Sequence, residues 1–304
     1  MSDKIPLTVV HHGRFNPETH VGGVETFART LRQIFERVLF STSDRPLCAL
    51  ARAERLPVIC DNQSVRDWPR DVRLIGFRHG VAAEKVKSTR SFTDLRLAAG
   101  QLLAARRSGV TWVGCADWIR QSSQSWYRSP TPHIVYHPVD LERFDGKLTN
   151  WGSRLILHDA RTVHKGKQLI SCLQTAFPTW RFEALNCPPD HVPERLRHAA
   201  AFVHLSRYEG NSIVLNEAMA MDLPCLCTNV GLLRDANIQL DVDCVDSRRA
   251  FGDERYLLER ARAFLDTLTT RRYNPRAWSE THASFPAARE RWRHVLEDWR
   301  TNLG

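Results

Sequence analysis

The chain has 304 residues, enough for one large domain or for two domains of about 150 residues each, and its hydrophobic share of 42% allows well-filled cores. Lys and Arg outnumber Asp and Glu by 43 to 34, which gives a formal net charge of +9. This excess favours an anionic partner such as a phosphorylated metabolite, an anionic membrane face or a nucleic acid. No apolar run approaches the roughly 18 residues of a membrane-spanning helix, which argues against an integral membrane protein.

The eight cysteines lie mostly within apolar runs, as is typical of buried, reduced thiols in a cytoplasmic protein. Cys225 and Cys227 share one face of a predicted strand, but no second ligand pair accompanies them, so we expect no metal there. The first residues lead directly into a strand-like run, and we expect no secretory signal peptide. A cytoplasmic location is therefore predicted.

The first predicted elements are a strand at residues 7–11 and a helix at residues 22–37. The helix is indicated by an apolar stripe at helical spacing, formed by Val24, Phe27, Leu31, Ile34 and Phe35. A strand, a glycine-containing turn and a helix form the general layout of phosphate-binding sites. The complete G-x-G-x-x-G pattern is absent, so a dinucleotide fold has little support from this turn.

Short apolar runs continue at residues 38–41, 58–61, 73–77, 111–115 and 133–137, with helical patterns at 92–107 and 116–127. After a crossing at residues 138–151, predicted strands cover 154–158, 181–185, 201–206, 223–228 and 242–245, and predicted helices cover 167–176, 255–267 and 287–299. Such alternation predicts an α/β protein with parallel sheets. We expect two Rossmann-like, doubly wound lobes with a cleft between them: residues 1–138, completed by a C-terminal helix at 286–304, and a shortened lobe at 139–285.

The most informative unit is the strand and helix joined by a turn at residues 201–221. The strand ends at Glu209 and Gly210, and Asn211 or Ser212 can cap the helix that follows. In an open α/β sheet, ligands bind outside the carboxyl ends of the strands, and a helix N-terminus favours an anion. This unit is therefore a candidate ligand site.

Two carboxylates, Glu209 in the turn and Glu217 inside the helix, lie eight residues apart. An ionised carboxylate only accepts hydrogen bonds, which suits a polyol because sugar hydroxyls are donors. The alternative interpretation is an ordinary strand and helix with two solvated acids.

Four landmarks occur in a characteristic order, namely Gly22-Gly23-Val-Glu-Thr-Phe, Val135-Tyr-His-Pro-Val-Asp-Leu-Glu-Arg-Phe144, Arg161-Thr-Val-His-Lys165-Gly166 and Glu209-Gly with Glu217-Ala-Met-Ala. In this combination the chain resembles the retaining glycosyltransferases of family 4, which have the two-lobed GT-B fold and a Glu-x7-Glu signature. The resemblance implies transfer of a sugar from a nucleotide-diphosphate sugar, with uridine the expected base. The expected acceptor is a glycan or lipid-linked glycan in bacterial-type polysaccharide or glycolipid synthesis.

The resemblance also implies roles for individual residues of the second lobe. Arg161 and Lys165 are expected to hold the donor diphosphate, Glu209 the hydroxyls of the donor sugar, and Glu217 those of the ribose. The backbone amides of Asn211, Ser212 and Ile213 are expected to meet sugar and phosphate oxygens.

In the first lobe, the resemblance implies that the turn at Gly22 and Gly23 brings an amide to the diphosphate and that His79 reaches the reacting sugar. A histidine at a strand end can equally well cap a loop. His11, His12 and Arg14 in the first glycine turn could contact an acceptor or a phosphate, or lie in an ordinary surface loop. His137 and His164 are expected to be structural or exposed.

We expect neither a metal ion nor another cofactor, because arginine and lysine can stabilise a leaving diphosphate. Asp241-Val-Asp243 has an Asp-x-Asp pattern, but it follows the motif helix, and we assign no metal to it. Retention of configuration could proceed by a front-side path or by double displacement through a carboxylate nucleophile.

Six basic residues surround the predicted helix at 92–107: Lys85, Lys87, Arg90, Arg96, Arg106 and Arg107. They form either ordinary solvated charge or a docking patch for anionic lipid headgroups, which predicts peripheral contact with the inner face of a membrane. No recognised nucleic-acid module accompanies the charge, so no nucleic-acid partner is expected.

The second lobe is short after the strand at 181–185, where relatives have a further glycine turn and a strand–helix unit that helps to hold the base. His137-Pro138 also stand where the family has Asn-Gly. The rival hypothesis is therefore a non-catalytic sugar-nucleotide or glycan-binding protein of the same fold.

Overall fold

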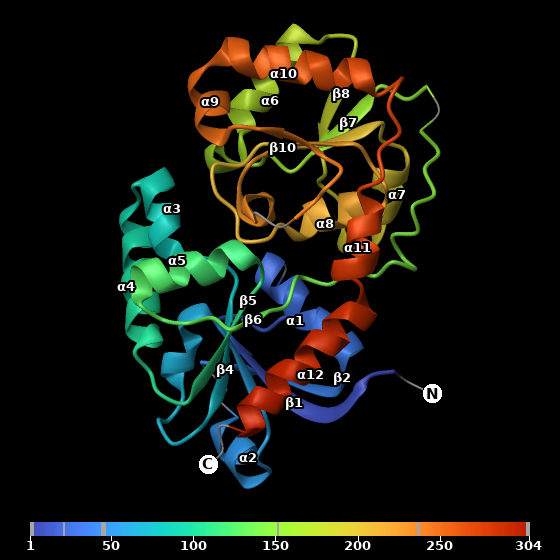
Figure 1. Ribbon diagram of the computed structural model, residues 1–304. Helices are drawn as coiled ribbons and strands as arrows, with labels where there is room; N and C mark the ends of the chain where they lie inside the picture. Colours follow the sequence, from blue (N-terminus) through green and yellow to red (C-terminus); the bar gives the residue numbers. More distant parts are fainter. Residues whose placement is uncertain (1–2, 21, 44–46, 151, 236–237, 302–304) are drawn as a thin grey trace. The chain divides into compact units, whose positions relative to one another are not determined.

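The computed structural model describes residues 3–20, 22–43, 47–150, 152–235 and 238–301, so Trp151, at the end of the predicted crossing, lies outside the described residues. The chain divides into two compact units (Figure 1). The first unit runs to Pro138 and resumes at Phe285, and the second is Val139–Ser284. In the part of the chain that is described, no helix is both long and apolar enough to span a membrane.

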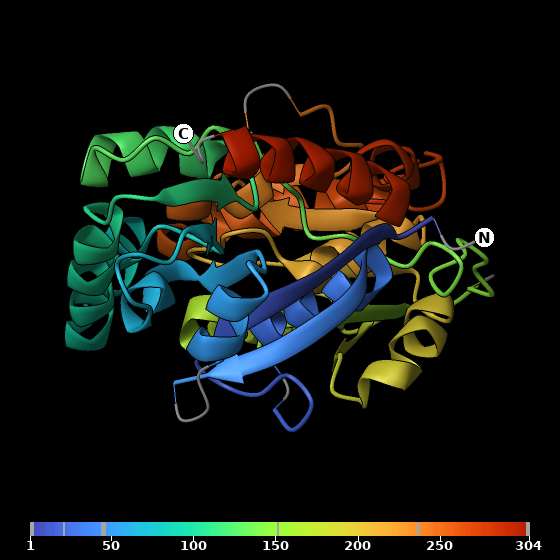
Figure 2. The same cartoon turned by 90° about the horizontal axis from the view of Figure 1, so that it is seen from below.

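The first unit is built on a six-stranded parallel sheet in the order β2-β1-β3-β4-β5-β6. Its strands are β1 (Ile5–Gly13), β2 (Phe35–Thr42), β3 (Val58–Asp61), β4 (Leu74–Arg78), β5 (Val110–Gly114) and β6 (His133–Ile134). Every residue of β3 and β4 is buried, as expected for parallel strands covered on both faces. Figure 2 shows β2 at the edge of this sheet, beside β1.

The helices of the first unit are α1 (Gly23–Ile34), α2 (Cys48–Ala53), α3 (Ala82–Thr89), α4 (Phe92–Ala105), α5 (Asp117–Tyr127) and α12 (Phe285–Thr301). The last of them, α12, packs against α1, β5 and β6. Its Trp292 is fully buried, with ring contacts to Phe35 and Phe77. The helices α2 and α3 were not predicted, because elements this short carry little periodic signal.

The helix predicted over residues 22–37 is shorter in the structure and ends at Ile34. The chain passes directly into β2 at Phe35, whose φ of −106° and ψ of 151° are extended. Phe35 is fully buried and contacts Trp292 of α12. The helix therefore ends next to a residue that packs against the last helix of the chain. The apolar periodicity of residues 22–37 cannot predict such a long-range contact.

The second unit is built on a five-stranded parallel sheet in the order β11-β10-β9-β7-β8. Its strands are β7 (Leu155–His158), β8 (Arg181–Ala184), β9 (Ala201–His204), β10 (Cys225–Thr228) and β11 (Asp243–Val245). Its helices are α6 (Lys167–Ala176), α7 (Val192–Arg197), α8 (Ile213–Ala220), α9 (Ser247–Gly252), α10 (Glu254–Thr267) and α11 (Arg276–His282). The predicted strands of this half are all present, and α7, α9 and α11 are additional short helices.

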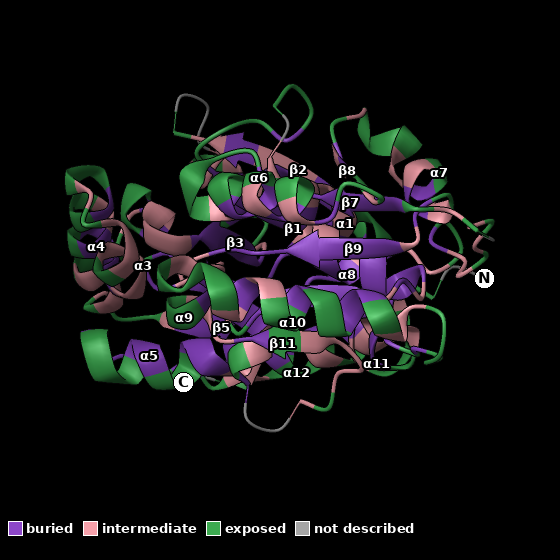
Figure 3. Ribbon diagram, turned by 90° about the horizontal axis from the view of Figure 1, so that it is seen from above, coloured by how far each residue is buried: buried purple, intermediate pink, exposed green. Residues whose placement is uncertain are grey.

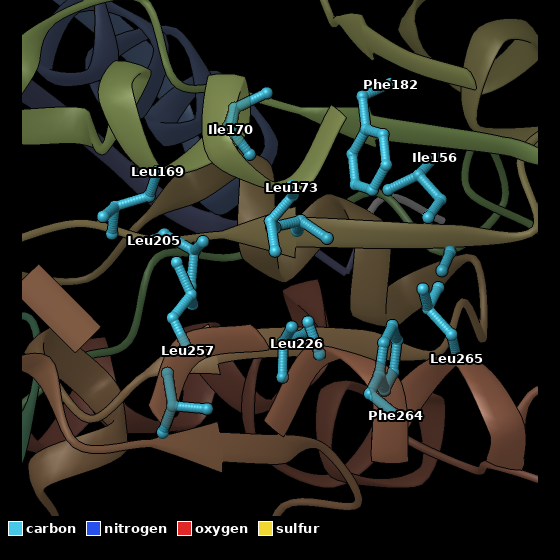
Figure 4. Packing of buried hydrophobic residues seen from close by; sticks show 14 of the residues in the cluster. Ile156, Leu169, Ile170, Leu173, Phe182, Leu205, Leu226, Leu257, Phe264 and Leu265 are labelled. Atoms are coloured by element: carbon cyan, nitrogen blue, oxygen red, sulfur yellow. The ribbon is translucent and has the colours of Figure 1, made fainter. Parts of the chain in front are cut away.

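The core of the second unit lies between one face of its sheet and the helices α6 and α10 (Figure 4). Ala201 and Val203 of β9 belong to this core. Because side chains alternate along a strand, Phe202 and His204 point to the opposite face. Figure 3 shows the buried strands in purple and exposed residues along the outer side of α10. A buried polar residue, His204, is therefore directed away from the apolar core at the end of a central strand.

Candidate functional site

The predicted candidate site at residues 201–221 is formed by β9, a turn and α8. Ser212 caps α8, and its Oγ accepts a hydrogen bond from the Leu215 amide at 3.4 Å. Gly231 has a φ of +60°, and a Cβ there would lie only 2.7 Å from Cβ of Glu209. Glycine therefore permits the segment after β10 to pack directly against the turn that carries Glu209.

Glu209 forms an ion pair with Lys165 through its Oε1. Ser206 Oγ donates to the same oxygen at 2.7 Å, and the Lys165 ammonium also reaches Asp159 Oδ2 at 3.2 Å. Burial lowers the pKa of Lys165, but the two carboxylates outweigh it and hold the pKa above its ordinary value. The Lys165 and Glu209 side chains remain 34% and 14% exposed, so a fixed positive charge and a carboxylate are accessible side by side.

Lys165 is placed by a tight loop after β7. The short 3-10 turn Val163–Lys165 is capped by Thr162, whose Oγ1 accepts from the Lys165 amide at 3.3 Å. Gly166 has a φ of +79°, and a Cβ there would stand 2.1 Å from the carbonyl oxygen of Leu205. Residue 166 must therefore be glycine, because any side chain there would collide with the backbone just after β9.

Arg161 opens the same loop, but the structure does not bring it into the Lys165–Glu209 pair. Its side chain is exposed, and its guanidinium donates to the carbonyl oxygen of Leu185, just after β8, at 2.8 Å. Its predicted contact with a diphosphate stays a prediction.

The remaining predicted residues of this unit lie just before α8 or within it. Asn211 and Ser212 are buried just before the helix, and Ile213 is its first residue. Glu217 lies one turn further on, where burial raises its pKa to about 7 against the opposing charge of Arg143. Glu217 is therefore partly protonated near neutral pH.

Two residues of the site, Asp159 and His204, were missed by the sequence analysis. His204 Nδ1 donates to Asp159 Oδ1 at 2.8 Å. Burial raises the pKa of Asp159, but His204 and Lys165 outweigh it and hold the pKa well below its ordinary range. The available signal was a polar residue at the end of each apolar run, Ile156-Leu-His-Asp159 and Phe202-Val-His204. Sequence alone does not reveal that the two meet.

Asp159, His204 and Glu209 also offer ligand atoms within 4.8 Å of one another, a spacing that could hold a metal ion. The Lys165 ammonium already contacts both carboxylates of this group. The cation between them is thus a side chain. In Asp241-Val-Asp243, both carboxylates are engaged by protein donors, from Arg271, Tyr273 and the Asn274 amide.

In the first unit, His79 belongs to a buried polar cluster at the ends of β1, β3 and β4. Its Nε2 contacts Asp61 Oδ1 at 2.8 Å, and its Nδ1 lies 3.3 Å from Nε2 of His137. His11 Nε2 shares the same Asp61 oxygen at 3.2 Å. Burial raises the pKa of Asp61, but the charges and hydrogen bonds of His11 and His79 outweigh it and hold the pKa well below its ordinary range. The predicted contact of His79 with a sugar stays a prediction.

The interpretation of His11 and His12 as members of a surface loop is wrong. Both belong to β1 and are almost completely buried, and His12 contacts Ser41 at 3.0 Å and Asp67 at 3.1 Å. The sequence suggested a loop because polar residues follow the apolar part of the strand. Here the polar side chains are buried because carboxylates on neighbouring segments satisfy them.

The predicted glycine turn of the first unit precedes α1. Gly22 is the N-cap residue, and its φ of −165° is ordinary extended backbone. Gly23 begins the helix, and a Cβ there would meet nothing within 4 Å. The Gly23 position is therefore open on the side where a side chain would stand, and its predicted contact with a diphosphate stays a prediction.

The surface of α4 exposes large apolar side chains. Phe92, Leu95 and Leu103 are 73%, 53% and 50% exposed, and they recur at helical spacing with the exposed Arg96 and Arg106 among them. Of the six basic residues predicted here, Arg107 must be removed from the patch. Its guanidinium points inward and donates to the carbonyl oxygens of residues 68, 69 and 72.

A family model described as "Glycosyl transferases group 1" matches residues 184–244 of the chain, the segment that contains β9, α8, Glu209 and Glu217. No curated protein matches the chain. Among solved structures, sucrose-phosphate synthase from Thermosynechococcus elongatus is similar at a TM-score of 0.75 and 11% identity, with 97% of this chain and 100% of that chain covered.

Anabaena HepE in complex with UDP and glucose is similar at a TM-score of 0.66 and 12% identity, with 96% of this chain and 100% of that chain covered. The apo form of the lipopolysaccharide outer core galactosyltransferase WaaB is similar at a TM-score of 0.58 and 13% identity, with 96% of this chain and 99% of that chain covered. At these identities the likeness shows the fold. The chain has the GT-B fold, with two parallel-sheet α/β units.

Proposed function

We propose that this protein is a retaining glycosyltransferase that transfers a hexose-type sugar from a nucleotide-diphosphate sugar, with UDP as the nucleotide, to a glycan or lipid-linked glycan. The observation that carries the proposal is the accessible ion pair between Lys165, in the loop after β7, and Glu209, in the turn before α8. It lies partly within the segment that matches the glycosyltransferase family model. The GT-B neighbours support the donor class, because one of them holds UDP and glucose.

In the proposed reaction, Lys165 and the backbone amides at the N-terminus of α8 stabilise the negative charge that develops on the leaving diphosphate. Lys165 is suited to this role because the flanking carboxylates keep it charged. Arg161 adds a second cation if its guanidinium turns from Leu185 to a phosphate. These protein charges meet the electrostatic need of the step, and we propose a metal-independent reaction.

Glu209 is proposed to bind the donor sugar. Among the described residues, Lys165, Ser206 and, at a longer distance, His204 contact Glu209 through its Oε1. Oε2 is left to accept hydrogen bonds from sugar hydroxyls. Glu217, further along α8, is proposed to accept from the ribose hydroxyls. Front-side and double-displacement routes to retention are both compatible with this arrangement.

A second candidate function is non-catalytic binding of a sugar nucleotide or glycan. One observation favours it: between β8 and β9 the chain forms only a 3-10 turn at Pro189–His191 and the short α7. This leaves few elements in the second unit to surround a nucleotide base.

The two functions are separated by incubating the protein with a panel of nucleotide sugars and glycan acceptors and measuring release of the nucleoside diphosphate. We expect release with a UDP-sugar, and loss of release in Glu209→Ala with the fold retained. Binding without release, across all donors and acceptors, would favour the binding protein. Wild-type turnover in Glu209→Ala would remove Glu209 from the site.

We further propose that the protein works in the cytoplasm and contacts an anionic membrane surface through α4. Phe92, Leu95 and Leu103 supply apolar contact, and Arg96 and Arg106 supply charge that matches acidic headgroups. Flotation with vesicles containing phosphatidylglycerol tests this. Phe92→Ser should reduce binding, whereas Val163→Ser, a comparably exposed site in the second unit, should not. Equal flotation with neutral vesicles would contradict the proposal.

A further inference from the structure

Two buried side chains, Asp159 and His204, lie against the Lys165–Glu209 pair and have no proposed contact with the donor. Asp159 is 8% exposed and His204 is 1% exposed. The Asp159 carboxylate is divided between them, since Oδ2 contacts Lys165 Nζ at 3.2 Å and Oδ1 contacts His204 Nδ1 at 2.8 Å. Because an ionised carboxylate only accepts, Nδ1 of His204 carries the hydrogen.

The second ring nitrogen of His204 faces Glu209 without a hydrogen bond. Nε2 is buried and has no hydrogen-bond partner among the described residues, and its nearest carboxylate oxygen, Glu209 Oε1, lies 3.7 Å away. In a neutral imidazole this nitrogen presents a lone pair to a carboxylate oxygen, which is unfavourable. In an imidazolium it presents an N–H, and a small movement completes an ion pair. His204 Nε2 is therefore the position at which one added proton would complete the contact with Glu209.

The charges of the cluster explain when that proton is needed. Asp159 and Glu209 carry two negative charges and Lys165 one positive charge, so the cluster is net negative while His204 is neutral. A nucleoside diphosphate adds negative charge and competes with both carboxylates for the Lys165 ammonium. A positive charge on His204 would compensate the negative charges of Asp159 and Glu209 while the diphosphate is bound to Lys165.

Two other titratable side chains of the same sheet, Cys227 and His158, do not supply this charge. Cys227 of β10 is the register partner of His204, and burial raises the pKa of its thiol well above the ordinary value. His158 of β7 is the register partner of Val203, so its side chain points to the core face of the sheet and away from His204. It accepts from the Ala160 amide at 3.2 Å, and burial lowers its pKa. Both are therefore neutral near pH 7, and neither faces Asp159 and Glu209 as His204 does.

We propose that Asp159 and His204 are positioning residues of the donor site and that His204 takes up a proton when a nucleoside diphosphate binds. Protonated His204 holds Glu209 Oε1 while Lys165 turns to the phosphates, so Oε2 stays directed toward the sugar. The inference rests on the proposed donor site, but not on the identity of the acceptor.

Calorimetric titration with UDP, GDP and ADP in two buffers of different ionisation enthalpy counts the protons that accompany binding. We expect uptake of a fraction of a proton, up to about one, at about pH 7, where an ordinary histidine is mostly neutral. His204→Asn retains an amide donor for Asp159 but cannot titrate. It should abolish the uptake and weaken binding about tenfold or more, as expected for loss of a supporting contact.

Two variants serve as controls. His158→Asn removes a buried histidine of the same sheet that does not contact the carboxylates, and it should leave the uptake unchanged. Glu217 has a pKa of about 7 and lies in the same proposed site, so the proton count is repeated in Glu217→Gln. The uptake assigned to His204 should persist in that variant.

The outcomes separate the two proposals. If none of the nucleotides binds, the proposed function fails and this inference fails with it. Binding without uptake, or uptake that survives in His204→Asn, overturns this inference alone. If His204→Asn does not fold, the wild type and Glu217→Gln still decide the proton count. Asp159→Asn then tests positioning: we expect turnover to fall about 10- to 100-fold with donor affinity retained, whereas equal loss of both would indicate a merely structural role.

Discussion

The two units contain similar polar clusters at the carboxyl ends of their central strands, and the clusters differ in what surrounds a buried aspartate. In the first unit Asp61 accepts from two histidines, His11 and His79. In the second unit Asp159 accepts from His204 and from a cation, Lys165. In both clusters these partners hold the pKa of the aspartate well below its ordinary range.

The difference lies in accessibility and charge. The Asp61 cluster is almost entirely buried, with His79 and Asp61 side chains 9% and 7% exposed. The Asp159 cluster leads outward to Lys165 and Glu209, which are more exposed and oppositely charged. The proposed donor site is therefore built on the cluster whose buried Asp–His contact lies next to accessible charges.

The largest effect is expected when Lys165, the cation of the Asp159 cluster, is removed. Lys165→Ala should lower turnover about 10²–10³-fold, because it removes a preorganised positive charge at the leaving group. Lys167→Ala, an exposed lysine at the start of α6, is the matched control and should stay within about twofold of wild type, as expected for a solvated surface charge. Similar losses in both variants would show that general charge, not the Lys165 position, matters.

The first cluster should matter more for stability than for turnover. Asp61→Ala leaves two buried histidines without their shared acceptor and should lower the free energy of unfolding by about 3 kcal/mol. Glu209→Ala should lower it by about 1 kcal/mol or less, because its contacts are partly solvated. Urea unfolding measures both. A larger loss for Glu209→Ala would reverse the comparison.

A pH dependence sharpens the comparison further. Burial raises the folded-state pKa of Glu217 from 4.5 to about 7, so its protonated form contributes stability that is lost as the pH rises through about 7. The loss should be on the order of 2 kcal/mol. Glu217→Gln should remove it and be more stable than wild type at about pH 8, as urea unfolding across this range will show. The depressed pKa values of Asp61 and Asp159 act only at acid pH, where their stabilisation is lost as the pH falls.

The smallest expected effect concerns the helix starts. Ser212 caps α8 with its side chain, whereas Gly22 caps α1 without a side-chain hydrogen bond. Ser212→Ala should therefore cost about 1 kcal/mol of stability. Gly22→Ala should cost less, because its backbone is extended and the atom that an added Cβ would crowd, Glu25 Oε2 at 2.2 Å, is the end of a flexible side chain that can move. Thermal unfolding of both variants compares them. An equal cost would mean that the Ser212 hydrogen bond contributes little.

Much of the fold could be predicted because parallel strands that are covered on both faces must be continuous apolar runs, and these alternate with helical patterns along the chain. The end of α1 could not be predicted, because Phe35 is held by Trp292 from the last helix. Arg107 was misplaced for a similar reason, since its backbone acceptors come from another segment of the first unit.

By itself, the sequence determined the α/β class, the turn before α8 and the candidate residues Lys165 and Glu209, because glycines, caps and strand ends act over a few neighbouring residues. Only the tertiary structure decided that Lys165 pairs with Glu209 and that Asp159 and His204 support them. Their hydrogen bonds join the ends of separate strands. The register of the parallel sheet brings those ends together, and register is a property of the folded chain.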